Sequence, residues 1–208
     1  MAGTFMARQL SSSLSRSLSK TVASSPNSHI DWHDYNFPPC VKVIHFRLSD
    51  FNDPEKGVIR KIYISWILCL IVLSFNIVTT IVVVCDFEPG LHILYTLLNF
   101  FIGIVLCTLV FYLGYYGIAK REDGKLLKYK IGQVILCVLY LFFSLAPLGA
   151  INGWAKIPHY SDYDSGEAKF GIAMCVIESL IYTVNCALGG FCAFLVHKEK
   201  YIEAKGQI

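Results

Sequence analysis

The chain has 208 residues, of which 55% are hydrophobic and only 16% are charged. A typical soluble domain carries roughly 25% charged residues, so this composition excludes an ordinary soluble globular protein. The formal net charge is only +3, and the positions of the charges along the chain are therefore more informative than their sum.

The first 28 residues contain no acidic residue and are rich in serine. Three interpretations remain open: a disordered tail open to phosphorylation, an amphipathic helix on an anionic leaflet, or a mitochondrial presequence. We favour the disordered tail, because serine is a poor residue for a helix interior. Residues 1–35 are therefore expected to form a disordered, basic, serine-rich cytoplasmic tail.

Two short motifs lie at the end of this tail and just after it. His29, Asp31, His33 and Asp34 are of metal-ligand types, but a closed site needs further ligands at short range, so we expect no bound metal. The prolines of the second motif hold the chain extended, and residues 36–61 are predicted to be a cytoplasmic juxtamembrane segment. The candidate partner-binding residues of this second motif are Asn36, Phe37, Pro38 and Pro39.

Four long hydrophobic blocks, separated by short polar segments, occupy residues 62–197. Each is at least as long as the roughly 20 residues that cross a hydrocarbon core of about 30 Å. Because backbone amides in lipid must be bonded within their own segment, each block is predicted to be a helix. The fold class is therefore an all-α membrane protein with four transmembrane helices in an antiparallel bundle. The predicted helices cover about residues 62–85, 91–116, 131–153 and 170–196.

Glycine and proline refine this prediction. Pro147 is expected to kink the third helix near its end. Two small-residue motifs, Gly149 to Gly153 and Gly189 to Ala193, are expected to let helices approach one another closely within the bundle.

The distribution of lysine and arginine predicts the orientation. These residues are frequent before the first block, between the second and third blocks, and in the tail at residues 198–208. The first loop, at residues 86–90, carries neither, and the third loop is mixed with acidic residues. Basic segments stay on the cytoplasmic side, so both termini and the second loop are expected to be cytoplasmic.

The stretch "YLGYYGIAKRED" at residues 112–123 joins the second block to this basic loop. Tyrosine suits the membrane interface, and basic side chains there face an anionic leaflet. Gly114 and Gly117 are expected to let the chain turn along the membrane plane. The candidate lipid-binding residues are Tyr115, Tyr116, Lys120, Arg121, Lys125 and Lys128.

Glu178 is the one ionisable residue well inside a hydrophobic block. A charge at a helix centre costs about 2.5–3.5 kcal/mol on insertion scales, so we expect Glu178 to face the bundle and to find a polar partner. It serves either helix packing, the favoured interpretation, or an ion or proton path. Asn76 is singled out with it as an intramembrane polar residue, and the possible partners are Asn76, Asn99, Gln133 and Asn152.

No nucleotide-binding loop, hydrolase nucleophile motif or paired intramembrane carboxylate is present in the sequence. We therefore expect a protein that is not an enzyme and has no cofactor.

The order of the motifs resembles one known family. An Asn-aromatic-Pro-Pro motif comes first, Trp66 and Asn76 lie on the first helix, a very short loop follows, and "GYYGIAKR" ends the second helix. Gly153 and Trp154 then stand near the end of the third helix, and a basic tail follows the fourth. From about Asn36 to Tyr201 the chain resembles the secretory carrier-associated membrane proteins (SCAMPs), tetraspan proteins of post-Golgi and endocytic membranes.

The resemblance implies a role for the second loop. In that family this segment is an amphipathic peptide that binds phosphoinositides and is linked to vesicle fusion. Tyr116, Gly117, Ala119 and Arg121 match the core of that peptide, although the family's tryptophan and the proline before the tyrosine are missing here. The family's Asn-Pro-Phe repeats, which bind endocytic adaptors, are also absent.

The function expected from these features is non-enzymatic membrane trafficking in vesicle transport or exocytosis. The expected location is a post-Golgi, recycling-endosome, secretory-vesicle or plasma membrane. The expected partners are the bilayer, anionic phosphoinositides and trafficking proteins that bind the N-terminal segment; nucleic acid is not expected, and self-association stays open. Two alternatives remain, a small channel or transporter that uses Glu178 and a mitochondrial membrane protein with a presequence.

Overall fold

The computed structural model describes residues 30–37, 42, 44–146 and 150–205, with side chains described up to Lys198. The predictions for residues 1–28, for Pro38 and Pro39, and for a kink at Pro147 lie outside the described residues. The chain divides into two compact units, Met1–Lys56 and Gly57–Ile208, and we describe each by itself.

In the first unit, the residues around Asn36 form a small hairpin. Phe37 pairs with Ile44 in an antiparallel β-bridge, with backbone bonds of 2.9 and 3.0 Å in the two directions. The side-chain oxygen of Asn36 accepts a bond of 2.8 Å from the backbone N–H of Phe46, and the rings of Phe37 and Phe46 are 5.3 Å apart. A short 3₁₀ helix, η2 (Leu48–Asp50), follows. Asn36 and Phe37 are therefore part of a local fold.

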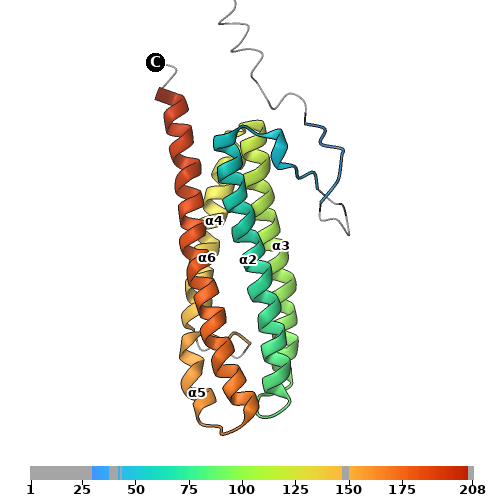
Figure 1. Cartoon of the computed structure of the whole chain (residues 1–208), viewed down its shortest axis with the longest axis vertical. Coiled ribbons are helices and arrows are strands. Elements are labelled where there is room, and N and C mark those ends of the chain that lie inside the picture. Colours follow the sequence, from blue (N-terminus) through green and yellow to red (C-terminus); the bar gives the residue numbers. More distant parts are fainter. Residues whose placement is uncertain (1–29, 38–41, 43, 147–149, 206–208) are drawn as a thin grey trace, which may run out of the picture. The chain divides into compact units, whose positions relative to one another are not determined.

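Four long helices dominate the structure (Figure 1). They are α2 (Asp53–Val84), α3 (Leu91–Lys120), α4 (Asp123–Leu145) and α6 (Gly166–Lys205). All four are long and apolar enough to cross a membrane, which confirms the predicted fold class. Within the second unit the helices run side by side, and successive long helices are antiparallel. We call the end with the α3–α4 connection the turn end, and the opposite end the α5 end.

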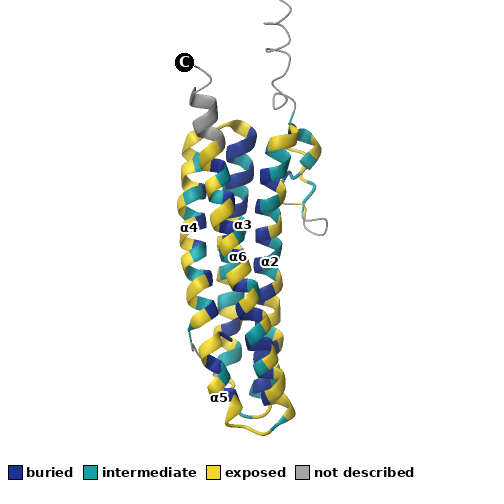
Figure 2. Cartoon of the chain, turned by 60° about the vertical axis from the view of Figure 1, so that its left-hand side comes forward, coloured by how far each residue is buried: buried dark blue, intermediate teal, exposed yellow. Residues whose placement is uncertain are grey.

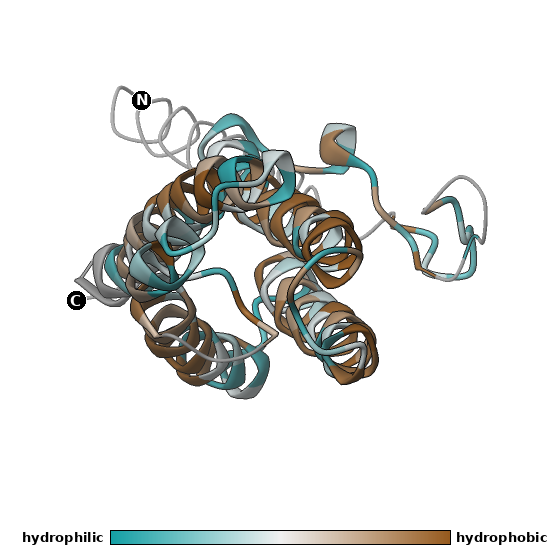
Figure 3. Cartoon of the chain, turned by 90° about the horizontal axis from the view of Figure 1, so that it is seen from below, coloured by the Kyte–Doolittle hydropathy of each residue, from teal (hydrophilic) through white to brown (hydrophobic). Residues whose placement is uncertain are grey.

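The hydrophobic residues are distributed as in a membrane protein. Phe101, Val105 and Val138 are 62–66% exposed on the outside of the helices, whereas Glu178 and Asn185 are completely buried. Figure 2 shows this pattern of exposed outer and buried inner faces, and Figure 3 shows that hydrophobic residues predominate along the long helices. An apolar exterior around a polar interior is stable in hydrocarbon and not in water.

Local sequence signals fix where two of the helices begin. Glu55 reaches back to accept a bond from the backbone N–H of Asn52 at the start of α2, as in a capping box. The hydroxyl of Ser165 accepts a bond of 3.1 Å from the N–H of Ala168 at the start of α6. In each contact a side-chain oxygen accepts a hydrogen bond from a backbone N–H at the helix start, where such groups lack a partner within the helix.

The connection between α3 and α4 corrects one prediction. The chain does not turn at Gly114 or Gly117, because α3 continues to Lys120 and Arg121 alone takes the left-handed conformation, with φ of 51°. A Cβ on Gly114 would lie 2.8 Å from the Tyr129 ring, and one on Gly117 would lie 2.8 Å from the side chain of Leu126. These two glycines therefore let α3 and α4 pack closely. The prediction that they let the chain turn along the membrane plane was wrong.

The end of α4 corrects a second prediction. The helix was expected to reach about residue 153 but stops at Leu145, and Ala146 is extended, with φ of −75° and ψ of 139°. Residues 150–153 are buried without helical structure. They lead into η3 (Trp154–Lys156) and a short helix, α5 (Ile157–Ser161).

Of the two predicted small-residue motifs, only the one that begins at Gly189 lies at a helix–helix contact among the described residues. Gly153 has extended backbone, with φ of −80° and ψ of 169°, so it is not part of a helix–helix motif, and Gly149 lies outside the described residues. Gly189 on α6 does face α4, where a Cβ would contact the amide of Gln133 and the sulfur of Cys137. Close approach of α4 and α6 therefore depends on Gly189.

Candidate functional site

Glu178 on α6 lies at the centre of a buried polar cluster near the α5 end. Its side chain is completely buried in the bundle. This orientation was predicted, because a charged side chain exposed to hydrocarbon is costly in free energy. The hydroxyl of Thr79 donates to one carboxylate oxygen at 2.7 Å, and the amide of Asn76 donates to the other at 3.2 Å. The amide of Asn152 donates to both oxygens, at 3.1 and 3.2 Å. Four hydrogen bonds from three residues therefore satisfy the carboxylate.

Asn152 belongs to the segment that folds back after α4, and it extends the cluster outward. The hydroxyl of Tyr160 donates to the side-chain oxygen of Asn152 at 3.0 Å, and the ammonium of Lys156 donates to the Tyr160 oxygen at 2.8 Å. Burial first, and then nearby acidic groups that include Glu88 and Glu178, raise the pKa of Tyr160. Tyr160 therefore stays protonated and keeps its donor.

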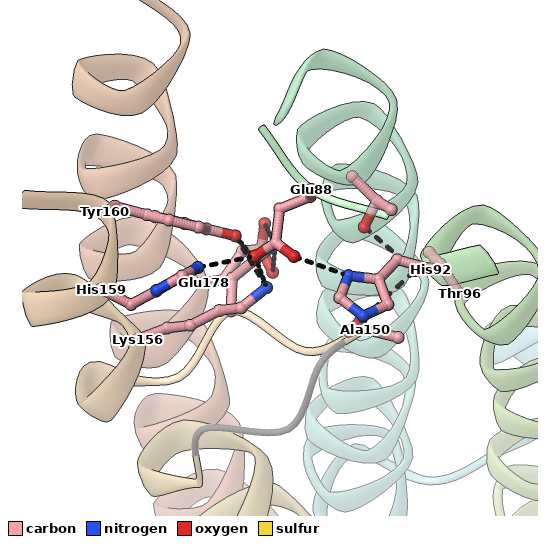
Figure 4. Close-up of polar contacts among 10 residues, drawn as sticks. Glu88, His92, Thr96, Ala150, Lys156, His159, Tyr160 and Glu178 are labelled. Atoms are coloured by element: carbon pink, nitrogen blue, oxygen red, sulfur yellow. Dashed lines mark hydrogen bonds and ion pairs between the residues drawn. The ribbon is translucent and has the colours of Figure 1, made fainter. Parts of the chain in front are cut away.

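Glu88, in the connection between α2 and α3, forms the outer part of the cluster (Figure 4). One of its oxygens is 3.0 Å from the ammonium of Lys156 and 3.5 Å from Nε2 of His159. Its other oxygen is 2.9 Å from Nδ1 of His92. Glu88 and Lys156 are only 8% and 6% exposed. Burial of a single charge is costly, and here each charge has an opposite charge beside it.

We name these seven residues the polar cluster, and they lie toward the α5 end of the bundle. They are Asn76, Thr79, Glu88, Asn152, Lys156, Tyr160 and Glu178. Thr96 of α3 adds a nearby contact by bonding Thr80 of α2 at 3.0 Å and the carbonyl of Ala150 at 3.3 Å. The cluster therefore ties α2, α6, α5 and the folded-back segment together.

The geometry favours packing over conduction. Hydrogen bonds from Thr79, Asn76 and Asn152 satisfy the Glu178 carboxylate entirely from within the bundle. Between Ser65 and Asn76, the buried residues of α2 are apolar: Trp66, Cys69, Val72 and Leu73. Polar contacts do continue between α4 and α6, where Ser144 bonds to Ser179 and Thr183. The satisfied carboxylate, and not an apolar barrier, is therefore the feature that favours packing.

The cluster contains two of the four partners predicted for Glu178. Asn76 and Asn152 bond to it directly, whereas the Gln133 amide lies against Gly189 and Asn99 lines an apolar cavity. The sequence pattern does not single out Thr79, Glu88, Lys156 or Tyr160 as part of the site. The loops that carry Glu88 and Lys156 informed only the predicted orientation, through their overall charge.

The candidate lipid-binding residues lie around the α3–α4 connection. Lys120, Arg121 and Lys128 are exposed, and the ammonium of Lys125 lies 5.5 Å from the centre of the half-buried Tyr116 ring. Tyr115 is completely buried, with its ring 6.3 Å from that of Phe111. Tyr115 therefore packs in the bundle and does not offer its ring to headgroups.

Among the described residues, no group of three or more histidine, cysteine or acidic side chains could hold a metal ion. The described candidate partner-binding residues, Asn36 and Phe37, are both partly buried within the hairpin of the first unit.

The fold and the cluster define a membrane protein with four spanning helices and a buried polar centre. The model of the SCAMP family matches residues 34–201, and the chain belongs to this family of membrane-trafficking proteins. Comparisons with curated proteins and with solved structures gave no match.

Proposed function

We propose that this protein acts in vesicle transport or exocytosis at post-Golgi, endosomal, secretory-vesicle or plasma membranes, and that it is not an enzyme. The family match over residues 34–201 is the observation that supports this proposal. The protein would work through contacts with anionic lipid at the turn end and with trafficking proteins at its N-terminal segment. We do not propose a channel or transporter, because four hydrogen bonds from within the bundle satisfy the Glu178 carboxylate.

The proposed orientation places both termini and the turn end in the cytoplasm. Lys120, Arg121, Lys125, Lys128 and Lys130 all lie near the α3–α4 connection, and such basic segments are retained on the cytoplasmic side. The α5 end would then face the lumen or the cell exterior.

Labelling with a membrane-impermeant maleimide tests this orientation. Cys85 is exposed at the α5 end, and in sealed microsomes we expect it to react only after the membrane is permeabilised. A Gly124→Cys substitution at the turn end is the matched control, since a Cβ there meets no atom within 4 Å. Mass spectrometry would locate each label, and labelling of Cys85 in intact microsomes would contradict the orientation.

The proposed lipid contact uses the exposed basic residues of the turn. Arg121 can bind a phosphate through two parallel hydrogen bonds, whereas Lys120 acts as a point charge. Glu122 and Asp123 stand beside them and should weaken the attraction. The α3–α4 connection would thus bind polyanionic headgroups such as phosphoinositides, with Tyr116 rather than Tyr115 as the tyrosine nearest to them.

We expect a Lys120→Ala, Arg121→Asn double variant to bind a short-chain phosphoinositide about 2 kcal/mol more weakly than the parent chain, at about 1 kcal/mol per charge. Asparagine is chosen at position 121 because it tolerates the left-handed conformation found there. Titration of the purified full-length protein would measure this loss, and added salt should reduce binding by the parent.

The control for this titration is Lys169→Ala, which removes one exposed charge at the other end, where Lys169 pairs with Asp164 at 2.8 Å. Equal binding by the parent and the double variant, or equal binding of a neutral lipid, would show that the turn has no lipid site.

A further inference from the structure

Two adjoining apolar cavities lie along α3 and α4 and share part of their lining. The cavity nearer the turn end has a volume of about 350 Å³ and includes Lys128, Ile131 and Ile135. The other has a volume of about 250 Å³ and includes Asn99, Tyr140 and Tyr182. Leu106, Leu136 and Leu139 line both cavities. We call the combined space the α3–α4 groove.

The groove opens on the outside of the bundle. Among its lining residues, Leu109, Ile131 and Ile135 are 54–55% exposed, and Ile102 is 57% exposed. At its deeper part, the buried residues Leu73 and Tyr182 form the inner wall. The groove therefore runs from the outer surface of the membrane helices toward the bundle interior.

The helix packing explains why this space is open. Near the turn end, α3 and α4 approach closely, because Gly114 accommodates Tyr129 and Gly132 accommodates Val110. Farther along, α3 packs on α2, where Gly103 accommodates the side chain of Leu73. At a similar level α4 bonds to α6, where the Cys137 thiol donates to the carbonyl of Cys186 at 3.4 Å. At this level α3 and α4 are thus each held by a different helix.

The chemistry of the groove indicates its occupant. Apolar cavities exclude water, and this one faces the hydrocarbon around the helices, so an acyl chain is the fitting ligand. Lys128 lies at its turn-end rim, where a lipid headgroup carries its phosphate. From Lys128 to Phe143, α4 extends for about 22 Å at 1.5 Å per residue, enough for an acyl chain in a leaflet about 15 Å deep.

We propose that the α3–α4 groove binds one acyl chain of an anionic glycerophospholipid, whose phosphate pairs with Lys128. The headgroup part of this inference rests on the lipid contact proposed for the turn. The acyl-chain part depends only on the groove. The ligand is a resident lipid of the turn-end leaflet, and it completes the packing between α3 and α4.

Photo-crosslinking of the full-length protein in nanodiscs tests the proposal. The probe is a phosphatidylserine with a diazirine in the middle of one acyl chain, and mass spectrometry locates the labelled residues. We expect the label to concentrate on groove residues such as Leu106, Ile135 and Leu139, and to be sparse at Val105 and Val138. Val105 and Val138 are 66% and 62% exposed and lie outside the groove lining.

Two pairs of variants provide matched controls. Leu106→Trp and Leu139→Trp fill the groove and should each lose most of the groove label, whereas Val105→Trp and Val138→Trp place the same ring on lipid-facing positions and should keep it. Circular dichroism verifies that all four variants retain their helices, and two filling variants keep the test decisive if one of them does not fold.

Lys128→Gln should remove the preference for the phosphatidylserine probe over a phosphatidylcholine probe while the groove label persists. Label spread evenly over all exposed positions, equal labelling of filled and control variants, or displacement of the probe by cholesterol would overturn the proposal. Loss of headgroup binding in the Lys120, Arg121 variant with the groove label intact would support the turn site and the groove independently. Groove labelling without any phosphoinositide binding to the parent would remove the turn proposal and the headgroup part of this inference, and would leave the acyl-chain part standing.

Discussion

Asn152→Leu is expected to destabilise the bundle by about 3 kcal/mol, because hydrogen bonds to charged groups contribute about 1.5–3 kcal/mol. The substitution takes two of the four hydrogen bonds from the Glu178 carboxylate and removes the acceptor of Tyr160. The carboxylate would stay buried with only the donors of Thr79 and Asn76. Unfolding by sodium dodecyl sulfate in mixed micelles, followed by circular dichroism, measures the change in the free energy of unfolding.

A second substitution makes this prediction specific. Adding Glu178→Leu to Asn152→Leu removes the charge that lost its partner, so the double variant should recover part of the stability. Asn99→Leu is the matched control, because Asn99 lines an apolar cavity and its loss should cost little. Strictly additive effects of the two leucine substitutions would show that Asn152 and Glu178 are not coupled.

Gly153→Ala is expected to cost about 3 kcal/mol, at the upper end of overpacking costs. An added Cβ would lie 2.6 Å from the backbone oxygen of Ala146, 3.0 Å from that of Phe143 and 3.1 Å from the backbone nitrogen of Ala146. These atoms belong to the end of α4 and cannot rotate away as a side chain can. The folded-back segment that carries Asn152 would have to shift, and the bonds to Glu178 would weaken with it.

Gly166→Ala is the control for this prediction, because a Cβ at Gly166 meets no atom within 4 Å. That variant should be as stable as the parent or slightly more stable, by about 0.4–1 kcal/mol. The same unfolding measurement applies to both variants, and indistinguishable stabilities would mean that the close approach at Gly153 does not constrain the fold.

The four membrane helices were predictable because the hydrophobic blocks are long and nearly free of charge. The end of α4 was missed because the apolar run continues to residue 153, and hydrophobicity does not distinguish a helix from a buried irregular segment. The residue before Pro147 carried the better signal, since a residue before proline avoids helical conformation, and Ala146 is indeed extended.

The polar cluster was predictable only at its centre. Glu178 stands out because a charge inside a hydrophobic block requires partners, and this reasoning found Asn76 and Asn152. Lys156 and Tyr160 were missed because they come from the loop that folds back against the bundle, and such a return is not encoded in helical periodicity. Loop charges such as Glu88 and Lys156 indicate orientation in a sequence, whereas burial and pairing depend on the tertiary fold.

The stretch that ends α3 shows that tyrosine and glycine near a membrane boundary can have either of two structural roles. Tyrosine and glycine near a membrane boundary suggested an interfacial segment, but Tyr115 and Gly117 are buried between packed helices. A glycine that frees the backbone and a glycine that admits a neighbouring side chain look the same in a sequence. Only the partner across the interface, Tyr129 for Gly114 and Leu126 for Gly117, separates them.

Imaging of a tagged full-length chain in cells, together with sequencing of its mature N-terminus, tests the proposed trafficking role most directly. We expect puncta that coincide with post-Golgi or endosomal markers, and an N-terminus that retains the serine-rich segment. A mitochondrial signal from a chain shortened at its N-terminus would contradict the proposed function.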